Sequence, residues 1–112
     1  MTGPRVLPGR TTEAAFLKQV IDLCHRCHWR VMHVRHAQVR EGKWITHGAG
    51  DIAGWPDVFA VRGHRAVALE LKTEKGVATA AQLDWLAALG HAGVEAHVVR
   101  PSQWDWLMEV LR

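Results

Sequence analysis

Long apolar segments are absent from this chain: it has no run of about 18 apolar residues, the length that a membrane-spanning helix needs. The first ten residues, MTGPRVLPGR, also contain no apolar stretch of the kind found in secretory signal peptides. A membrane-spanning helix is therefore not expected, and we expect the chain in the cytoplasm. Tyrosine is absent as well, although six tryptophans are present, which is unusual for 112 residues.

Disorder is not expected, because the composition is that of an ordinary globular protein. Hydrophobic residues make up 48% of the chain and charged residues 22%. A chain of this length forms one domain with a modest core. Residues 1–10 carry two prolines and two glycines and are predicted to form an extended arm, so the folded domain would span residues 11–112.

The charge of the chain is compatible with a nucleic-acid partner without requiring one. The formal net charge is +3 and the pI is about 9.3. Basic residues are densest between positions 25 and 47, which makes this stretch the candidate DNA-facing surface. The candidate contacts are Arg35, His36, Arg40 and Lys43, together with Lys75 in a later turn. The alternative is that these side chains are simply solvated.

Residues 24–28 (CHRCH) match the spacing of covalent haem attachment. Haem attachment of this kind belongs to exported proteins, and the sequence shows no export signal. The pattern also falls on a predicted helix, where Cys24 and Cys27 follow the helical spacing of Phe16 and Val20. We therefore expect two thiols that pack as small core side chains, and no haem. A zinc site would need two further ligands.

The spacing of apolar residues and turn formers predicts the element order αβββαβα. This order favours an α/β (α+β) domain with a mixed sheet flanked by helices. In chain order the predicted elements are a helix from Thr11 or Thr12 to about Cys27, a strand at 29–36, a long loop at 37–55, hairpin strands at 57–62 and 65–72, a helix at 79–89, a strand at 94–100, and a final helix capped by Ser102.

The predicted hairpin brings two carboxylates together. Its strands, DVFAVR and RAVALELK, are rich in β-branched and apolar residues and are separated only by Gly63-His64. Glycine at the first central position suits a type II′ turn. Counting back from the turn gives the cross-strand pairs of the hairpin, which are Val61 with Ala66, Phe59 with Ala68, and Asp57 with Glu70.

This pairing predicts a cation between Asp57 and Glu70, because like charges opposite each other destabilise a sheet. Oxygen ligands suit Mg²⁺ or Mn²⁺ rather than Zn²⁺. Lys72 shares their face and lies about 6–7 Å along the strand from Glu70, within reach of a phosphate. The alternative is a charge cluster that protects a sheet edge from aggregation. The opposite face carries apolar residues, namely Val58, Val67, Leu69 and Leu71.

Pro56-Asp57 followed by Glu70-Leu71-Lys72 resembles the signature of the PD-(D/E)XK nucleases. The wider pattern is similar to their VRR-NUC (virus-type replication-repair nuclease) branch, in its small stand-alone phage or bacterial form. A bare PD…ExK pattern recurs by chance, whereas its order with the glutamine-bearing helix is more specific. The likeness covers most of the chain and is carried by Glu13, Gly54–Asp57, Glu70–Gly76, Thr79–Leu86 and Arg100–Trp104.

The resemblance implies a restriction-endonuclease-like core and a DNA endonuclease that depends on Mg²⁺ or Mn²⁺. Asp57, Glu70 and the backbone carbonyl of Leu71 would hold the ion, which activates water and neutralises charge on the phosphate. Lys72 would orient the water or stabilise the developing negative charge.

Two further residues enter through the resemblance. Glu13 could be an outer metal ligand or complete a second metal position, and Gln82 would align Lys72 or the water. Both also have structural explanations: Glu13 suits the dipole of the first helix turn, and Gln82 forms a capping box with Thr79.

The resemblance also implies partners, since stand-alone members act as homodimers on branched DNA such as four-way junctions, in phage-infected or other bacterial cytoplasm. Two other functions stay open. One is a DNA-binding module without catalysis. The other is a restriction-type nuclease that reads a specific sequence, although no residue can be assigned to the base edges.

Overall fold

The structure is a computed structural model that describes residues 11–34, 37–39, 43–45 and 48–112. The predicted arm at residues 1–10 lies outside the described residues, as do Arg35, His36 and Arg40. Lys43 lies in a strand of which only the backbone is described. Four of the five candidate DNA contacts therefore have no described side chain, and all five stay predictions.

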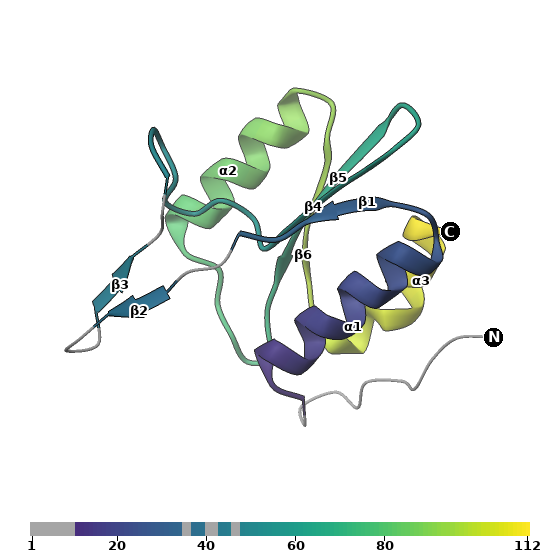
Figure 1. The fold of residues 1–112 in the computed structure, drawn as a ribbon, viewed down its shortest axis with the longest axis horizontal. Helices are drawn as coiled ribbons and strands as arrows, with labels where there is room; N and C mark the ends of the chain where they lie inside the picture. Colours follow the sequence, from purple (N-terminus) through teal and green to yellow (C-terminus); the bar gives the residue numbers. More distant parts are fainter. Residues whose placement is uncertain (1–10, 35–36, 40–42, 46–47) are drawn as a thin grey trace.

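The chain forms a four-stranded mixed sheet with helices on both faces (Figure 1), which confirms the predicted fold class. The sheet order is β1-β4-β5-β6, antiparallel except for the parallel pair β5 and β6. Helices α1 and α3 lie on one side of the sheet and α2 on the other. The elements are α1 (Glu13–Arg26), β1 (Arg30–Met32), β2 (Ala37–Val39), β3 (Lys43–Ile45), β4 (Val58–Arg62), β5 (Arg65–Leu71), α2 (Ala80–His91), β6 (Glu95–Val99) and α3 (Trp104–Leu111).

The predicted hairpin register is confirmed. In the β4–β5 pair, Phe59 lies opposite Ala68 and Val61 opposite Ala66, with Arg62 and Arg65 flanking the turn. Gly63, the first central residue of the turn, has a φ of 60°. His64, the second, does not have a positive φ, because His28 is the one non-glycine residue with positive φ in the described part of the chain. A positive φ at the first central residue alone is the geometry of a type II′ turn, as predicted.

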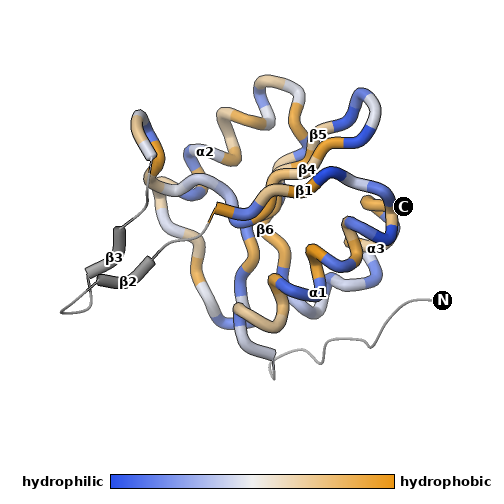
Figure 2. The backbone as a smooth tube through the Cα atoms, in the orientation of Figure 1, coloured by the Kyte–Doolittle hydropathy of each residue, from blue (hydrophilic) through white to orange (hydrophobic). Residues whose placement is uncertain are grey.

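The predicted apolar face of the hairpin forms the core with α1 and α3. The two helices contribute Phe16, Val20, Leu107 and Leu111, all at most 1% exposed. Figure 2 shows that the hairpin is hydrophobic along its length and hydrophilic at its turn. The sheet contributes the side chains that pack against these helices, namely Val58, Ala60, Val67, Leu69, Leu71 and Val99.

Helix α1 begins as predicted, since the hydroxyl of its N-cap Thr12 accepts from the N–H of Ala15 over 3.1 Å. The side chain of Cys24 is completely buried in the core and Cys27 packs against it, and both are free thiols. The prediction that the CHRCH segment supplies core side chains is thus confirmed. In the described part of the chain, no helix combines the length and the apolar character needed to cross a membrane.

The predicted loop at 37–55 was wrong in its first half, because β2 and β3 form a separate antiparallel pair there. The observed order of elements therefore contains two strands more than αβββαβα. The glycines of the segment indicated a loop and obscured the β-forming residues Val39, Trp44 and Ile45. The first strand is also shorter than predicted: it ends at Met32, which is 52% exposed, whereas Val31 packs against the core.

Ser102 was predicted to cap the last helix, and this prediction was wrong. The segment Pro101–Gln103 forms a 3₁₀ turn that leads directly into α3. The backbone N–H of Ser102 donates instead to the Glu74 carboxylate over 2.7 Å, because the chain after β6 packs against the loop after β5.

Candidate metal centre

One cleft of about 420 Å³ collects the predicted site residues from four parts of the chain. Its walls come from the start of α1, the segment before β4, the end of β5 and the start of α2. The cleft is lined by Glu13, Asp57, Glu70, Leu71, Lys72 and Gln82. Tertiary structure therefore brings together residues that are up to 69 positions apart in the sequence, from Glu13 to Gln82.

Asp57 is oriented by the strand opposite to it. It lies directly before β4, one position beyond the paired residues Val58 and Leu69. Its Oδ2 accepts a hydrogen bond from the backbone N–H of Leu71 over 2.8 Å. This bond fixes the carboxylate of Asp57 next to Glu70, as the register predicts.

Gly54 brings the segment before β4 against α2. Its φ is 83°, a left-handed conformation that glycine adopts without strain. A Cβ at this position would lie 2.4 Å from the backbone carbonyl of Ala81 and 2.7 Å from the amide nitrogen of Gln82. Only glycine permits such an approach, and it places Asp57 and Gln82 at the same cleft.

Glu70 is the buried charge of the site. Its residue is 1% exposed, and Oε1 has no hydrogen-bond partner among the described residues. Burial, followed by the charge of Asp57 and a hydrogen bond with its carboxyl, raises the pKa of Glu70 to about 8, against an opposing effect of Lys72. A buried carboxylate with an unpaired oxygen is costly, so this group keeps its proton at neutral pH unless a cation takes the place of the proton.

β5 lies between β4 and β6, so Glu70 is on an interior strand of the sheet. This position argues against the alternative of a solvated charge cluster that protects a sheet edge. The Nζ of Lys72 lies 3.6 Å from Glu70 Oε2, and the Lys72 side chain is only 12% exposed. A single ammonium at that distance leaves Oε1 of Glu70 without a partner.

His33 belongs to the site, although the sequence did not single it out. Its Nδ1 lies 2.7 Å from the backbone carbonyl of Asp57, and its ring lines the cleft. Because a carbonyl only accepts, Nδ1 carries the proton in this contact. In the sequence His33 is one of several histidines in the basic stretch, and no local pattern distinguishes it from the others.

Gln82 forms the predicted capping box of α2. Its Oε1 accepts from the N–H of Thr79 over 2.8 Å, and its own N–H donates to the Thr79 hydroxyl over 3.2 Å. Glu13 is exposed in the first turn of α1, at the rim of the cleft. Both structural explanations therefore coexist with positions at the site.

Lys75 is exposed in the turn after Lys72 and is not among the residues that line the cleft. No group of three or more His, Cys, Asp or Glu side chains that could hold a metal occurs in residues 11–34 and 48–112. Asp57 and Glu70 are a pair, and Glu13 does not join them. A third protein ligand would come from the backbone, for which the Leu71 carbonyl is the candidate.

The residues present fit a hard divalent cation. Two carboxylates and a carbonyl offer oxygen ligands alone, the set preferred by Mg²⁺ and Mn²⁺. The unpaired buried oxygen of Glu70 is the observation that a cation would explain. Comparisons of the chain with family models, with curated proteins and with solved structures each gave no match.

Proposed function

We propose that the chain is a Mg²⁺- or Mn²⁺-dependent DNA endonuclease that hydrolyses phosphodiester bonds. The observation that carries this proposal is the buried, unpaired Oε1 of Glu70 beside the carboxylate of Asp57, in a cleft that also contains the Lys72 ammonium. The two carboxylates suit a divalent cation, and the ammonium suits a phosphate group. Each bound group would thus meet protein groups of opposite charge. The sequence resemblance to the VRR-NUC branch supports the same assignment.

Asp57, Glu70 and the Leu71 carbonyl would hold the ion. When bound, such a cation supplies Lewis-acid chemistry and stabilises negative charge on the phosphate. Lys72 adds a second positive charge that acts on a phosphate in the cleft, at a site where low exposure strengthens electrostatic interactions. Gln82 and His33 orient the surrounding backbone through their hydrogen bonds.

The proposed substrate is branched DNA, and the proposed active form is a homodimer. Two-fold symmetry would present two cutting sites to a symmetric junction. A net charge of +3 supports a polyanionic substrate. Light scattering of the purified chain tests the oligomeric state, and a strict monomer on DNA would exclude the paired-site arrangement.

The decisive assay incubates supercoiled plasmid and a synthetic four-way junction with the protein and Mn²⁺. We expect strand cleavage that is lost on addition of a chelator. Lys72→Ala should remove it, whereas Arg112→Ala, which changes an exposed basic residue that is not among those lining this cleft, should not. Binding of the junction without any cleavage would favour the alternative, a DNA-binding module that lacks catalysis. Cleavage of one sequence alone would favour a restriction-type enzyme.

A further inference from the structure

The four residues that follow Lys72 form a loop, Thr73–Gly76, that one arginine holds in place. Nη1 of Arg100 donates to the carbonyl of Thr73 over 2.6 Å and to that of Gly76 over 2.7 Å, with a longer contact of 3.3 Å to the carbonyl of Glu74. Hydrogen bonds from an ionised donor are stronger than neutral ones. The loop is therefore fastened to the segment that follows β6.

This loop lies against one side of the Lys72 side chain. A methyl group on Gly76 would lie 3.5 Å from Cδ of Lys72, so the glycine backbone is close to the lysine stem. The backbone of Lys72 is held as well, since its N–H donates to the carbonyl of Val99 over 3.0 Å. Val99 directly precedes Arg100 in the chain. A lysine stem is flexible, and a wall on one side reduces the conformations open to it.

We propose that Arg100 is a positioning residue for Lys72: it fixes the Thr73–Gly76 loop, and the loop holds the Lys72 stem so that its ammonium stays beside Glu70. The kinetic consequence rests on the proposed nuclease function. The positioning itself is a property of the chain and can be measured without metal or DNA.

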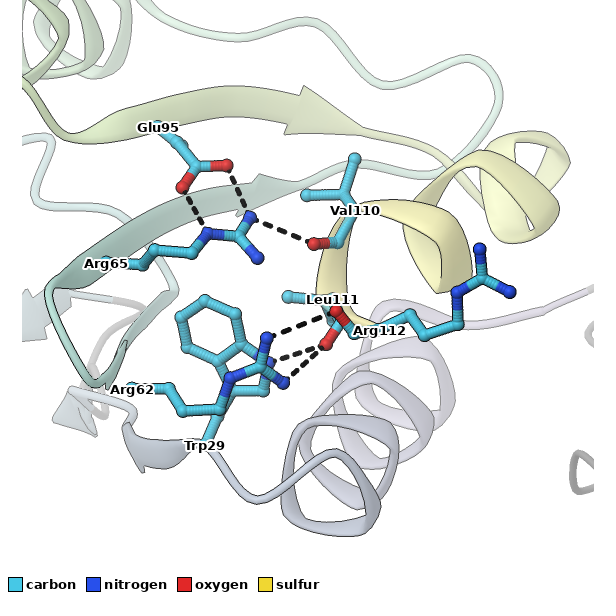
Figure 3. A network of polar contacts seen from close by, with 7 residues as sticks. All are labelled: Trp29, Arg62, Arg65, Glu95, Val110, Leu111 and Arg112. Carbon is cyan, nitrogen blue, oxygen red and sulfur yellow. Dashed lines mark hydrogen bonds and ion pairs between the residues drawn. The ribbon is translucent and has the colours of Figure 1, made fainter.

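The chain offers a matched control at the other end of the sheet. Arg62 also donates to three backbone carbonyls. One is that of Cys27 at 2.7 Å. The others are those of Leu111 at 3.0 Å and Arg112 at 3.1 Å (Figure 3). It lies beside the β4–β5 turn, whereas the cleft lies at the opposite end of these strands. Arg100→Gln and Arg62→Gln therefore remove similar contacts, but only the first adjoins Lys72.

The first measurement is the rate of reductive methylation of Lys72 in the metal-free protein, followed by mass spectrometry. We expect Arg100→Gln to raise this rate several-fold and Arg62→Gln to leave it at the wild-type value. Arg100→Lys, which keeps the charge and most of the reach, should restore part of the protection. Equal methylation of Lys72 in wild type and Arg100→Gln would overturn the proposal.

The second measurement is cleavage of junction DNA with Mn²⁺, at a temperature where all variants are folded. A small displacement of a reacting group is costly, so Arg100→Gln should lower kcat by about 10- to 100-fold and leave KM nearly unchanged, whereas Arg62→Gln should keep the wild-type kcat. If the wild type does not cleave, the nuclease proposal fails, but the methylation rates still decide the role of Arg100. If Arg100→Gln does not fold, Arg100→Lys and Arg62→Lys are compared in the same two assays.

Discussion

The backbone N–H of Leu71 donates to Oδ2 of Asp57 over 2.8 Å, so the strand that carries Glu70 also orients the carboxylate opposite to it. The amide of Leu71 faces Asp57 while the neighbouring side chain of Glu70 is buried beside it. Both acidic groups are thus held by the regular geometry of one hairpin. Two carboxylates held in this way form a pre-organised pair.

Two variants should show that metal binding and cleavage depend on different residues. Asp57→Ala removes a proposed ligand and should abolish measurable Mn²⁺ binding. Lys72→Ala removes only the ammonium, so it should bind Mn²⁺ with an affinity within about threefold of the wild type and lose cleavage by about 100-fold or more. Titration calorimetry and the junction assay test this, and equal metal affinity in all three proteins would remove Asp57 from the ligand set.

Glu70 should make the metal-free protein less stable as the pH rises. Its pKa is raised from 4.5 to about 8 in the fold, so the unfolded chain gives up this proton at a lower pH than the native chain does. The stability that protonated Glu70 contributes is then complete below about pH 4.5 and is lost by about pH 8.

Glu70→Gln has no such titration, so at pH 8.5 its Tm in chelator should exceed that of the wild type by about 5 °C or more, with a smaller difference at pH 5. Added Mn²⁺ should raise the Tm of the wild type and not that of the variant. Thermal unfolding monitored by circular dichroism checks both statements. A Tm difference that does not depend on pH would contradict the proposed titration.

The thiol of Cys24 should be inert in the folded protein. Burial, with a smaller contribution from Cys27, raises the pKa of Cys24 to about 12, and the thiolate is the reactive form. In the variant Cys27→Ser, Ellman's reagent at pH 8 should give no reaction until denaturant is added. The converse variant, Cys24→Ser, keeps the half-buried Cys27 and serves as the control, which should react without denaturant.

Gly54→Ala should be among the most destabilising substitutions in the chain. An added Cβ would meet the backbone of α2 at 2.4 Å, and the φ of 83° is unfavourable for alanine. Gly50→Ala is a matched control, since its φ is 85° but no atom lies within 4 Å of the added Cβ. Urea unfolding should show a loss of about 1–2 kcal/mol for Gly50→Ala and about 3 kcal/mol or more for Gly54→Ala. Equal losses would show that the contact with α2 relaxes without cost.

Much of the fold could be predicted from the sequence because its signals are local. The turn at Gly63-His64 and the alternation of Val58, Val67 and Leu69 indicated the hairpin register, since a two-residue loop leaves one pairing that puts these three residues on the same face. The capping box of Thr79 and Gln82 likewise depends on residues three apart. The pair of β2 and β3 was missed because glycine signals outweighed weak strand signals.

The amino-acid sequence alone determined which charged groups lie together on one hairpin, namely two carboxylates and a lysine, because strand alternation and turn length are properties of neighbouring residues. The tertiary structure decided which groups surround them. The burial of Glu70, the hydrogen bond from His33 to the Asp57 carbonyl and the hold of Arg100 on the loop after Lys72 depend on how α1, α2 and the segment after β6 pack around the sheet. No local pattern encodes these contacts, since they join residues 24 or more positions apart or depend on burial by the whole fold.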